Sequence, residues 1–178
     1  LNGTFEVSLE RQFLRPPDQK DFLTHQLNFN YDNRQIFPLF QKFLNRVLPD
    51  LASQQVLAEY IAYLFIPTSK LKLEKALFLY GQGANGKSVF FEIIMALLGS
   101  ENVSNFSIQS LTSKSGNSRA LIADKLANYS TEINGTMDSD FFKQLISGEP
   151  IEARWLYGEY FIITNYAKLM FNCNELPI

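Results

Sequence analysis

Apolar residues along this chain form two kinds of pattern, short unbroken runs and longer stretches with helical spacing. The run at 76–80 is nearly continuous, which is typical of a strand buried on both faces. From Phe90 to Leu98, apolar residues recur at intervals of three and four, so we predict an amphipathic helix that ends at Gly99. The chain therefore predicts a buried strand and a helix, joined by a glycine-rich stretch.

Two more helices are predicted before this strand. Pro38 suits the first turn of the first helix, whose apolar stripe runs over residues 40–48 before Pro49 breaks it. The second helix extends to about Phe65. Further upstream, residues 23–29 place apolar side chains on one face of a strand.

Shorter elements are predicted downstream of Gly99. The stretch 101–117 is rich in Ser and Asn, and we expect a loop with one short helix there. The other expectations are a helix at 120–123, a strand at 125–130, a helix from Asp138 or Ser139 to Gly148, a hairpin of strands 151–156 and 160–163 around residues 157–159, and a strand at 167–173.

Composition narrows the class of protein. A chain of 178 residues with 46% hydrophobic residues is large enough for one well-packed domain, with room for a small subdomain. Sixteen basic against eighteen acidic residues give no overall basic field, so DNA binding would need a local patch or the central channel of a ring. The single cysteine, Cys173, excludes an internal disulfide and fits a reducing cytosol. No apolar run approaches the length of a membrane span.

The stretch between the strand and the helix matches a phosphate-binding loop of nucleotide hydrolases, Gly-x-x-x-x-Gly-Lys-Ser/Thr. Its glycines are expected to allow positive φ and to leave no Cβ beside a ligand, so that backbone N–H groups can turn toward phosphate oxygens. Lys87 would reach the β- and γ-phosphates, and the Ser88 hydroxyl would help to hold Mg²⁺. The sequence thus predicts an ATP–Mg²⁺ site formed by Gly81, Gln82, Gly83, Ala84, Asn85, Gly86, Lys87, Ser88 and Val89.

A nucleotide hydrolase also needs a carboxylate near Mg²⁺ or the attacking water, and a polar group near the γ-phosphate. Such groups are expected at the carboxyl ends of parallel strands beside the loop. Glu132 fits the carboxylate role, but Asp124 and Asp140 are alternatives that the residues alone leave open. Asn174 could orient water through its amide, although an ordinary turn at the end of a strand explains it equally well.

Four motifs, taken in order, resemble the phage and plasmid primase–helicase family. They are Gly-x-Gly-x-Asn-Gly-Lys-Ser at 81–88, Ser-Thr-Glu at 130–132, Lys-Gln-Leu-Ile-Ser-Gly-Glu-Pro-Ile-Glu-Ala-Arg at 143–154, and Asn-Glu-Leu-Pro at 174–177. This family comprises superfamily 3 helicases with an AAA+-type core, related to poxvirus nucleoside triphosphatase–primases. The resemblance covers the chain from about residue 70 to its end, and residues 31–65 are similar to the helical segment that precedes the core in the family.

The resemblance implies roles for individual residues. Lys87 would be the Walker A lysine, and Ser88 would be a magnesium ligand. Glu132 would be the Walker B acid, which polarises water and holds the metal, and Asn174 would be the sensor 1 residue. The strand before Glu132 departs from the usual apolar Walker B strand because polar residues interrupt it, namely Asn128 and Ser130.

The resemblance also implies a DNA-gripping element. Residues 143–154 would lead into a β-hairpin that faces the central channel of a ring. The hairpin tip carries Glu159 and no lysine, so the contact could fall to Lys143, Arg154, Trp155, Tyr157 or Lys168, although simple packing explains the aromatic residues at least as well. The implied partners are single-stranded or forked DNA, further copies in a hexameric ring of the full-length protein, and a fused or associated primase, with no membrane.

We therefore expect an α/β fold, a P-loop NTPase core of AAA+ type with a central, mostly parallel sheet and a β-hairpin insertion. Residues 1–70 would be an N-terminal helical extension, and residues 71–178 would be the ATPase core, truncated after sensor 1. The family's arginine finger follows the sensor strand, so a fragment that ends at Ile178 should bind ATP but hydrolyse it weakly.

The expected function is that of an ATP-dependent replicative DNA helicase motor in the bacterial host cytoplasm. Two other functions stay open. The first is a nucleotide-gated assembly or DNA-binding module without significant hydrolysis. The second is a P-loop phosphotransferase, which would need a lid and an acceptor pocket that the sequence does not indicate.

Overall fold

The centre of the protein is a sheet of four parallel strands. A computed structural model describes residues 2–131, 133 and 137–175. The strand order is β3-β8-β5-β4, formed by β3 (Leu77–Tyr80), β8 (Lys168–Cys173), β5 (Ala127–Ser130) and β4 (Val103–Ser104). Because β8 comes last in the chain but lies between β3 and β5, residues far apart in sequence meet in the middle of the sheet.

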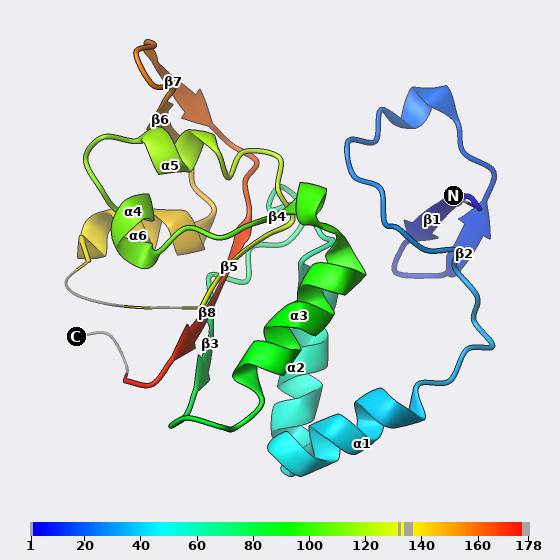
Figure 1. The fold of residues 1–178 in the computed structure, drawn as a ribbon. Helices are drawn as coiled ribbons and strands as arrows, with labels where there is room; N and C mark the ends of the chain where they lie inside the picture. The colour runs from blue at the N-terminus through cyan, green and yellow to red at the C-terminus, as the bar shows by residue number, and fades with distance from the viewer. Residues whose placement is uncertain (1, 132, 134–136, 176–178) are drawn as a thin grey trace.

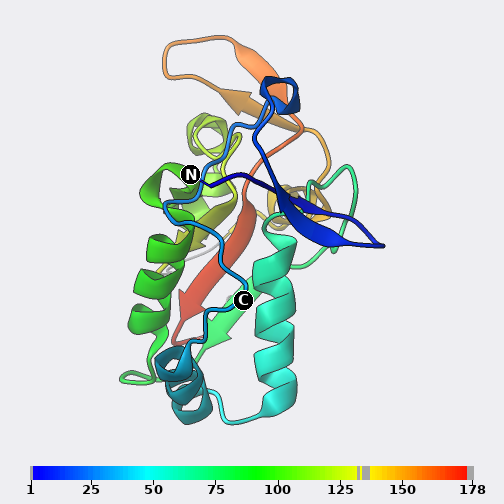
Figure 2. The ribbon, with the colours of Figure 1, turned by 90° about the vertical axis from the view of Figure 1, so that its right-hand side faces the viewer.

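Helices cover both faces of the sheet (Figure 1, Figure 2). One face carries α1 (Pro38–Val47), α2 (Leu51–Tyr63) and α3 (Lys87–Leu98), and the other carries α4 (Ile108–Leu111), α5 (Asn117–Ala120) and α6 (Ser139–Ser147). Each face has its own apolar cluster, and both clusters include side chains of the sheet. This sandwich is the arrangement of a P-loop NTPase-like core, so the predicted fold class is confirmed.

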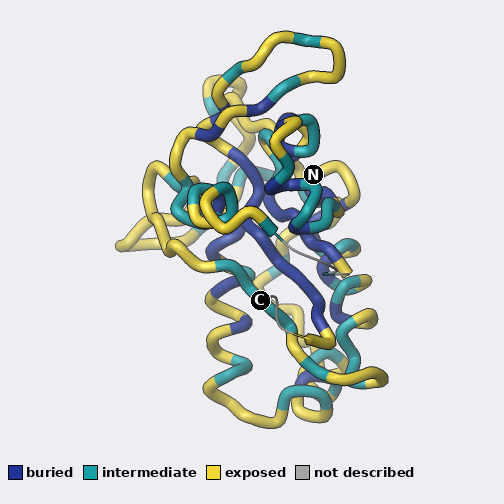
Figure 3. Tube along the Cα trace, turned by 90° about the vertical axis from the view of Figure 1, so that its left-hand side faces the viewer, coloured by how far each residue is buried: buried dark blue, intermediate teal, exposed yellow. Residues whose placement is uncertain are grey.

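Strand β8 is the axis of the core. All six of its residues are buried, and it forms a continuous buried run through the molecule in Figure 3. Met170 joins the cluster on the α1–α3 face, whereas Leu169 and Phe171 join the cluster on the α4–α6 face. A strand covered on both faces has no alternation of apolar and polar residues, which is why its sequence reads as a nearly unbroken apolar run.

The longer helices begin and end close to where the sequence predicts. Pro38 lies in the first turn of α1, and the Asp50 side chain caps α2 by accepting from the backbone N–H of Ser53 at 2.8 Å. Asp138 caps α6, which ends at Gly148 with φ 68°. The predicted hairpin is also present, formed by β6 (Ile151–Arg154) and β7 (Tyr160–Ile163).

The segment before α1 departs most from prediction. Three of its elements were not predicted. They are the antiparallel strands β1 (Thr4–Val7) and β2 (Gln12–Arg15) and the 3-10 turn η1 (Gln19–Asp21). The strand predicted at 23–29 is wrong, since those residues lie outside every described strand. Leu27 packs on the α1–α3 cluster instead, and the carbonyl of Gln26 accepts from the Asn102 side chain at 2.9 Å.

A network of charges holds this N-terminal hairpin. The Arg15 guanidinium donates to the Glu6 carboxylate at 2.8 Å and to both carboxylate oxygens of Asp21. The bonds from Arg15 lower the pKa of the Asp21 carboxyl, and so does a hydrogen bond that this carboxylate accepts from a backbone N–H of the adjacent turn. Phe5 and Val7 alternate with polar residues in β1, but both are exposed, so these charge pairs hold the hairpin. Pairing between charges that are distant in the chain leaves no signal in the pattern of apolar residues.

Two smaller predictions are also corrected. The helix predicted at 120–123 is wrong, because α5 ends at Ala120 and Ala123 forms an isolated antiparallel bridge with Tyr166. The stretch 101–117 contains the short helix α4, as expected, but also β4 and the end of the 3-10 turn η2 (Ser100–Asn102). Strand β5 begins at Ala127, two residues later than predicted.

The helices α1 and α2 pack as part of the sandwich. Leu44 of α1 and Leu57 of α2 belong to the same apolar cluster as Phe90 of α3 and Tyr129 of β5. The domain boundary at residue 70 stays a sequence-based interpretation. Although α1 and α2 precede this boundary, they pack in the same apolar cluster as residues that follow it. Within the described ranges, no helix has the length and apolar character that crossing a membrane requires.

Candidate nucleotide-binding site

The phosphate-loop motif joins the carboxyl end of β3 to the amino end of α3. The backbone N–H of Gly81 donates to the carbonyl of Cys173 at 3.1 Å, which anchors the start of the loop to β8. Ala84 and Gly86 have left-handed backbones, with φ of 62° and 84°. The expectation of positive φ is thus correct for Gly86 and wrong for Gly81 and Gly83. The loop turns through Ala84 instead, and alternating backbone conformations of this kind form anion-binding concavities.

The three glycines of the loop face different surroundings. A Cβ on Gly86 would lie 2.7 Å from Cγ1 of Val47 in α1, and a Cβ on Gly81 would collide with the Asn85 amide. A Cβ on Gly83 would meet nothing within 4 Å. Gly86 is therefore required by packing against α1 as well as by its backbone angle, whereas a side chain at Gly83 would point into open space.

Lys87 and Asn174 meet at the loop. The Nζ of Lys87 donates to the Gly81 carbonyl, to Oδ1 of Asn85 at 3.0 Å and to Oδ1 of Asn174 at 3.2 Å. Asn174 directly follows β8, the strand beside β3, so the sheet order brings these residues together. The three acceptors are neutral oxygens, so they orient the ammonium group without neutralising it. No carboxylate is among these three partners of Lys87.

Two buried hydrogen-bonded side chains connect the sheet to the backbone of Lys87. The Tyr129 hydroxyl in β5 donates to Oδ1 of Asn172 in β8 at 2.8 Å, and Nδ2 of Asn172 donates to the Lys87 carbonyl at 3.5 Å. Both side chains are buried, and burial raises the pKa of the Tyr129 hydroxyl. These hydrogen bonds link β5, β8 and the first turn of α3. These residues were not predicted as part of the site, although the polar Asn172 inside an apolar strand was a signal in the sequence.

Asn128 explains the unusual composition of β5. Its Oδ1 accepts from the Ser104 hydroxyl at 3.0 Å and from the backbone N–H of Phe106 at 2.9 Å, while its Nδ2 donates to the Phe106 carbonyl at 2.9 Å. The side chain is fully buried, and both of its polar atoms have partners. Asn128 therefore holds the segment that follows β4. A polar residue is tolerated at this buried position because its hydrogen bonds are made within the protein.

The candidate carboxylates occupy different places. Asp124 precedes β5, at the opposite end of that strand from the phosphate loop, and its carbonyl lies 2.5 Å from Nε2 of His25. Asp140 is exposed in the first turn of α6 and pairs with Lys143 at 3.8 Å. Glu132 follows the correct end of β5 in the chain, but it lies outside the described residues. Within those residues, no cluster of His, Cys, Asp and Glu could hold a metal ion.

The candidate DNA contacts lie mostly on the hairpin and α6. Lys143 is exposed on α6, and Tyr157 is exposed at the hairpin tip. Arg154 donates from Nε to the Gly158 carbonyl at 2.8 Å, and Trp155 stacks on Phe161 with ring centroids 5.8 Å apart. The structure thus groups Arg154, Trp155 and Tyr157 on one projecting element.

Lys168 has a different environment. It is buried in β8, where its Nζ donates to the Ile66 carbonyl at 2.7 Å and lies 5.2 Å from the centre of the Tyr63 ring. Burial lowers the pKa of Lys168 to about 8. This position argues against the DNA contact predicted for Lys168.

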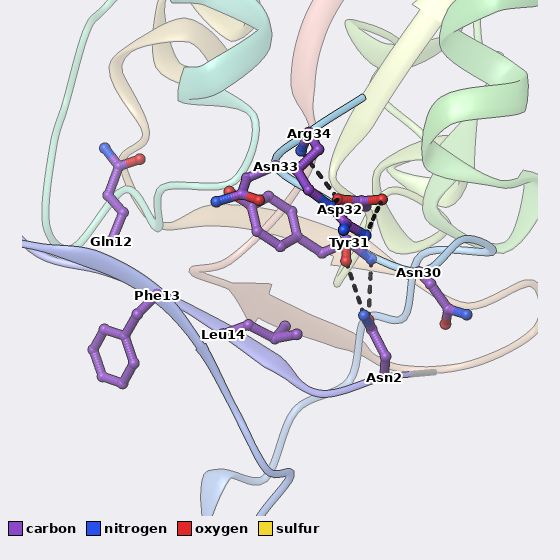
Figure 4. A pocket seen from close by; sticks show the side chains of 9 residues that line it. All are labelled: Asn2, Gln12, Phe13, Leu14, Asn30, Tyr31, Asp32, Asn33 and Arg34. Carbon is purple, nitrogen blue, oxygen red and sulfur yellow. Dashed lines mark hydrogen bonds and ion pairs between the residues drawn. The ribbon is translucent and has the colours of Figure 1, made fainter. Parts of the chain in front are cut away.

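A cavity away from the phosphate loop contains none of the predicted site residues. It encloses about 700 Å³ between the N-terminal hairpin and residues 30–34 (Figure 4). Its wall is fixed where the Asn2 amide exchanges two hydrogen bonds with the backbone of Tyr31. We place the candidate site at the phosphate loop, because that is where a cationic side chain, left-handed backbone and a helix N-terminus converge.

The profile of DUF5906, described as a family of unknown function, matches residues 79–178, which is more than half of the chain. The chain belongs to the DUF5906 family. The matched region of this DUF5906 chain begins in β3 and contains the phosphate loop, the hairpin and β8, so the whole candidate site lies within it.

Two viral proteins are similar to the DUF5906 chain over 99% of its length. One is the "Putative helicase" of Acanthamoeba polyphaga mimivirus, 28% identical over 188 residues, and the other is the "Putative helicase" of Invertebrate iridescent virus 3, 25% identical over 198 residues. The chain spans about a fifth of the length of these relatives, 19% and 20%.

The fold is shared with solved structures of the NrS-1 C terminal region. One is its apo structure, with a TM-score of 0.63 and 14% identity, and another is the A form apo structure, with a TM-score of 0.63 and 15% identity. The similarity covers 96% and 97% of this chain and 40% of each NrS-1 chain. Together with the viral relatives, these structures confirm the resemblance to the primase–helicase family that the four motifs indicated.

Proposed function

We propose that this chain is the ATPase core of a DNA helicase motor, which binds ATP–Mg²⁺ at the phosphate loop and couples hydrolysis to movement along DNA. The observation that carries the proposal is the 3.2 Å hydrogen bond between Nζ of Lys87 and Oδ1 of Asn174. It brings a loop cation and an amide from the neighbouring strand to one point, where both can face a γ-phosphate. The viral relatives named as helicases support this function.

In this proposal each site residue has a separate task. The backbone N–H groups of residues 81–88 hold phosphate oxygens, and the ammonium group of Lys87 balances their charge. The Ser88 hydroxyl and Glu132 hold Mg²⁺, which when bound supplies positive charge to the phosphates. Glu132 accepts a proton from the attacking water, and the amide of Asn174 orients that water.

Movement on DNA requires an element outside the nucleotide site. The β6–β7 hairpin is the proposed DNA contact, with Lys143 on the adjacent α6. We infer that copies of the protein form a ring, hexameric as the family resemblance implies, around single-stranded or forked DNA, with a fused or associated primase in the host cytoplasm. The ring places each nucleotide where a neighbouring subunit can complete the site.

ATP turnover by the full-length protein, with and without single-stranded DNA, tests the proposal. DNA should stimulate turnover. Glu132→Gln should keep ATP affinity and lower turnover by ~10²- to 10⁴-fold, the usual contribution of a general base. Lys87→Ala should weaken ATP binding by roughly 10- to 150-fold, because it removes a charged hydrogen-bond donor. Lys72→Ala, at an exposed lysine before β3, is the matched control and should change neither quantity.

Each contrary result has a distinct meaning. Unchanged ATP affinity in Lys87→Ala would refute the nucleotide site itself. Normal turnover in Glu132→Gln would remove the assignment of the catalytic acid. Tight ATP binding with no turnover in the presence of DNA would favour the nucleotide-gated module over the helicase.

A further inference from the structure

The β6–β7 hairpin presents its largest side chains to solvent. Tyr157 at the tip is 96% exposed. Four more large side chains of the hairpin are at least half exposed, namely Trp155 (53%), Leu156 (67%), Tyr160 (50%) and Ile162 (62%). The base of the hairpin is anchored differently, since Ile151, Ala153 and Ile163 are buried in the α4–α6 cluster. The projecting part, seen in Figure 2, is therefore an aromatic and apolar surface on a buried stem.

The charges of this hairpin do not suit a grip on phosphates. Residues 151–163 contain one basic side chain, Arg154, and two acidic ones, Glu152 and Glu159. Arg154 is engaged within the hairpin, where its Nε donates to the Gly158 carbonyl at 2.8 Å and its guanidinium lies 4.9 Å from the centre of the Tyr160 ring. The electrostatic part of phosphate binding, which makes affinity depend on salt, comes from Lys and Arg side chains that are available to the backbone.

The hairpin tip is ordered by its own contacts. The backbone N–H of Gly158 donates to the Trp155 carbonyl at 2.9 Å, and the indole of Trp155 stacks on Phe161 with 22° between the ring planes. The tip turns through Tyr157, whose φ is 61°. Rings already held in one orientation lose little conformational entropy when they bind a partner.

The base of the hairpin is fastened to the chain around α5. The Gly116 carbonyl accepts from the backbone N–H of Arg154 at 3.2 Å, and Nε of the fully buried Arg119 donates to the Glu152 carbonyl at 2.6 Å. The Arg119 guanidinium also lies over the Phe141 ring of α6, 4.3 Å from its centre. The base of the hairpin, which carries the exposed rings, is thus bonded to and packed against the core.

We propose that the hairpin binds single-stranded nucleic acid by stacking unpaired bases on Trp155 and Tyr157, without a phosphate contact of its own. This inference rests on the proposed function and specifies how its DNA contact is made. Flat rings suit bases because every base has a π-face, and such stacking tolerates any sequence. The engaged Arg154 and the net negative charge favour base faces over the charged backbone. Binding by this element is therefore insensitive to salt, unlike binding through phosphates.

The only tryptophan of the chain lies on this hairpin, so intrinsic fluorescence reports on it directly. Titration of the chain with an oligothymidylate of about 16 nucleotides should quench the Trp155 emission. Tyr157→Ala should weaken binding by roughly 5- to 150-fold, the range that one base–aromatic stack carries. The same factor should appear at about 50 mM and at about 200 mM salt.

Phe22→Ala is the matched control. Phe22 is also an exposed aromatic residue, 86% accessible, on a left-handed backbone with φ 47°, but it lies in the N-terminal segment. Its truncation should leave affinity and quenching unchanged. Arg154→Gln should leave the slope of log affinity against log salt unchanged, whereas loss of one phosphate contact would reduce that slope by about 0.7.

The results separate failure of this inference from failure of the proposed function. DNA binding without Trp155 quenching, or with a neutral Tyr157→Ala, would overturn base stacking and leave the helicase assignment standing. A reduced salt slope in Arg154→Gln would overturn it in favour of a phosphate contact. Self-association that Tyr157→Ala abolishes, with DNA affinity unchanged, would assign the surface to a protein contact. Absence of DNA binding, together with ATP turnover of the full-length protein that DNA does not change, would refute the function itself.

Discussion

The sharpest structural prediction concerns the two glycines Gly83 and Gly86 of the phosphate loop. Gly86→Ala adds a methyl group at a residue with φ 84°, a conformation that costs a residue with a Cβ about 1–2 kcal/mol. The new methyl would lie 2.7 Å from Cγ1 of Val47 and 3.3 Å from Cε2 of Phe43. Overpacking of this kind costs ~1–3 kcal/mol. The substitution should therefore lower the free energy of unfolding by roughly 2–5 kcal/mol.

Gly83→Ala, three residues away in the same motif, is the matched comparison. Gly83 is not among the glycines with positive φ, and a Cβ there would meet nothing within 4 Å. Stability should therefore stay unchanged or rise by as much as about 1 kcal/mol, because alanine restricts the unfolded chain. ATP affinity should nevertheless fall, since the added methyl would stand in the open space that we assign to phosphate.

Urea unfolding, followed by circular dichroism, measures both free energies. The double variant Gly86→Ala/Val47→Ala removes the methyl groups that the new Cβ would strike, so its destabilisation should be smaller than the sum of the single effects by about 1–3 kcal/mol. If Gly86→Ala unfolds within about 0.5 kcal/mol of the parent chain, the contact between the loop and α1 does not constrain this residue. If Gly83→Ala and Gly86→Ala lower the free energy of unfolding equally, the distinction between the two glycines is wrong.

Three further predictions concern buried polar groups. Arg119→Ala should destabilise the chain by about 3–5 kcal/mol in urea unfolding, because three carbonyl groups lose their buried donor, and a loss below about 1 kcal/mol would contradict this role. Tyr129→Phe should cost ~1–3 kcal/mol by leaving Oδ1 of Asn172 without its donor, and a neutral effect would show that the bond is dispensable. Burial lowers the pKa of Lys168 to about 8 in the folded state, so between pH 8 and about 10 the unfolded chain binds more protons and stability should rise with pH. Lys168→Met should remove that rise in unfolding measurements from pH 7 to 9.5, and an identical pH profile in both proteins would refute the assignment.

Local signals predicted the parts of the fold that depend on neighbours in the chain. The proline that opens α1, the start of α6 at Asp138 or Ser139 and the phosphate loop before α3 are all present. Each of these features depends on backbone angles or on hydrogen bonds within a few residues. The N-terminal hairpin was not predicted, because the short alternation in β1 faces solvent and the strands depend on charge pairs that link Arg15 to Glu6 and Asp21.

The candidate site was predictable only in part. The resemblance selected Glu132 and Asn174, whereas spacing alone left Asp124 and Asp140 open. The tertiary structure places Asp124 at the end of β5 opposite the phosphate loop and brings Oδ1 of Asn174 within hydrogen-bond distance of Lys87, while the role of Asn174 stays a prediction. Glu132 itself stays a prediction, because it lies outside the described residues.

The succession of a strand, a phosphate loop and a helix was predictable from residue patterns alone, because that unit is encoded within about twenty residues. Which polar side chains are buried in the core and which stay at the surface depends on the tertiary structure. Lys168 and Arg154 look alike as basic residues of predicted strands, yet the first is buried against the Ile66 carbonyl and the second spans an exposed hairpin tip. The difference arises because burial and hydrogen-bond partners depend on which distant segments meet. The insertion of β8 between β3 and β5 is the step that brings those segments together.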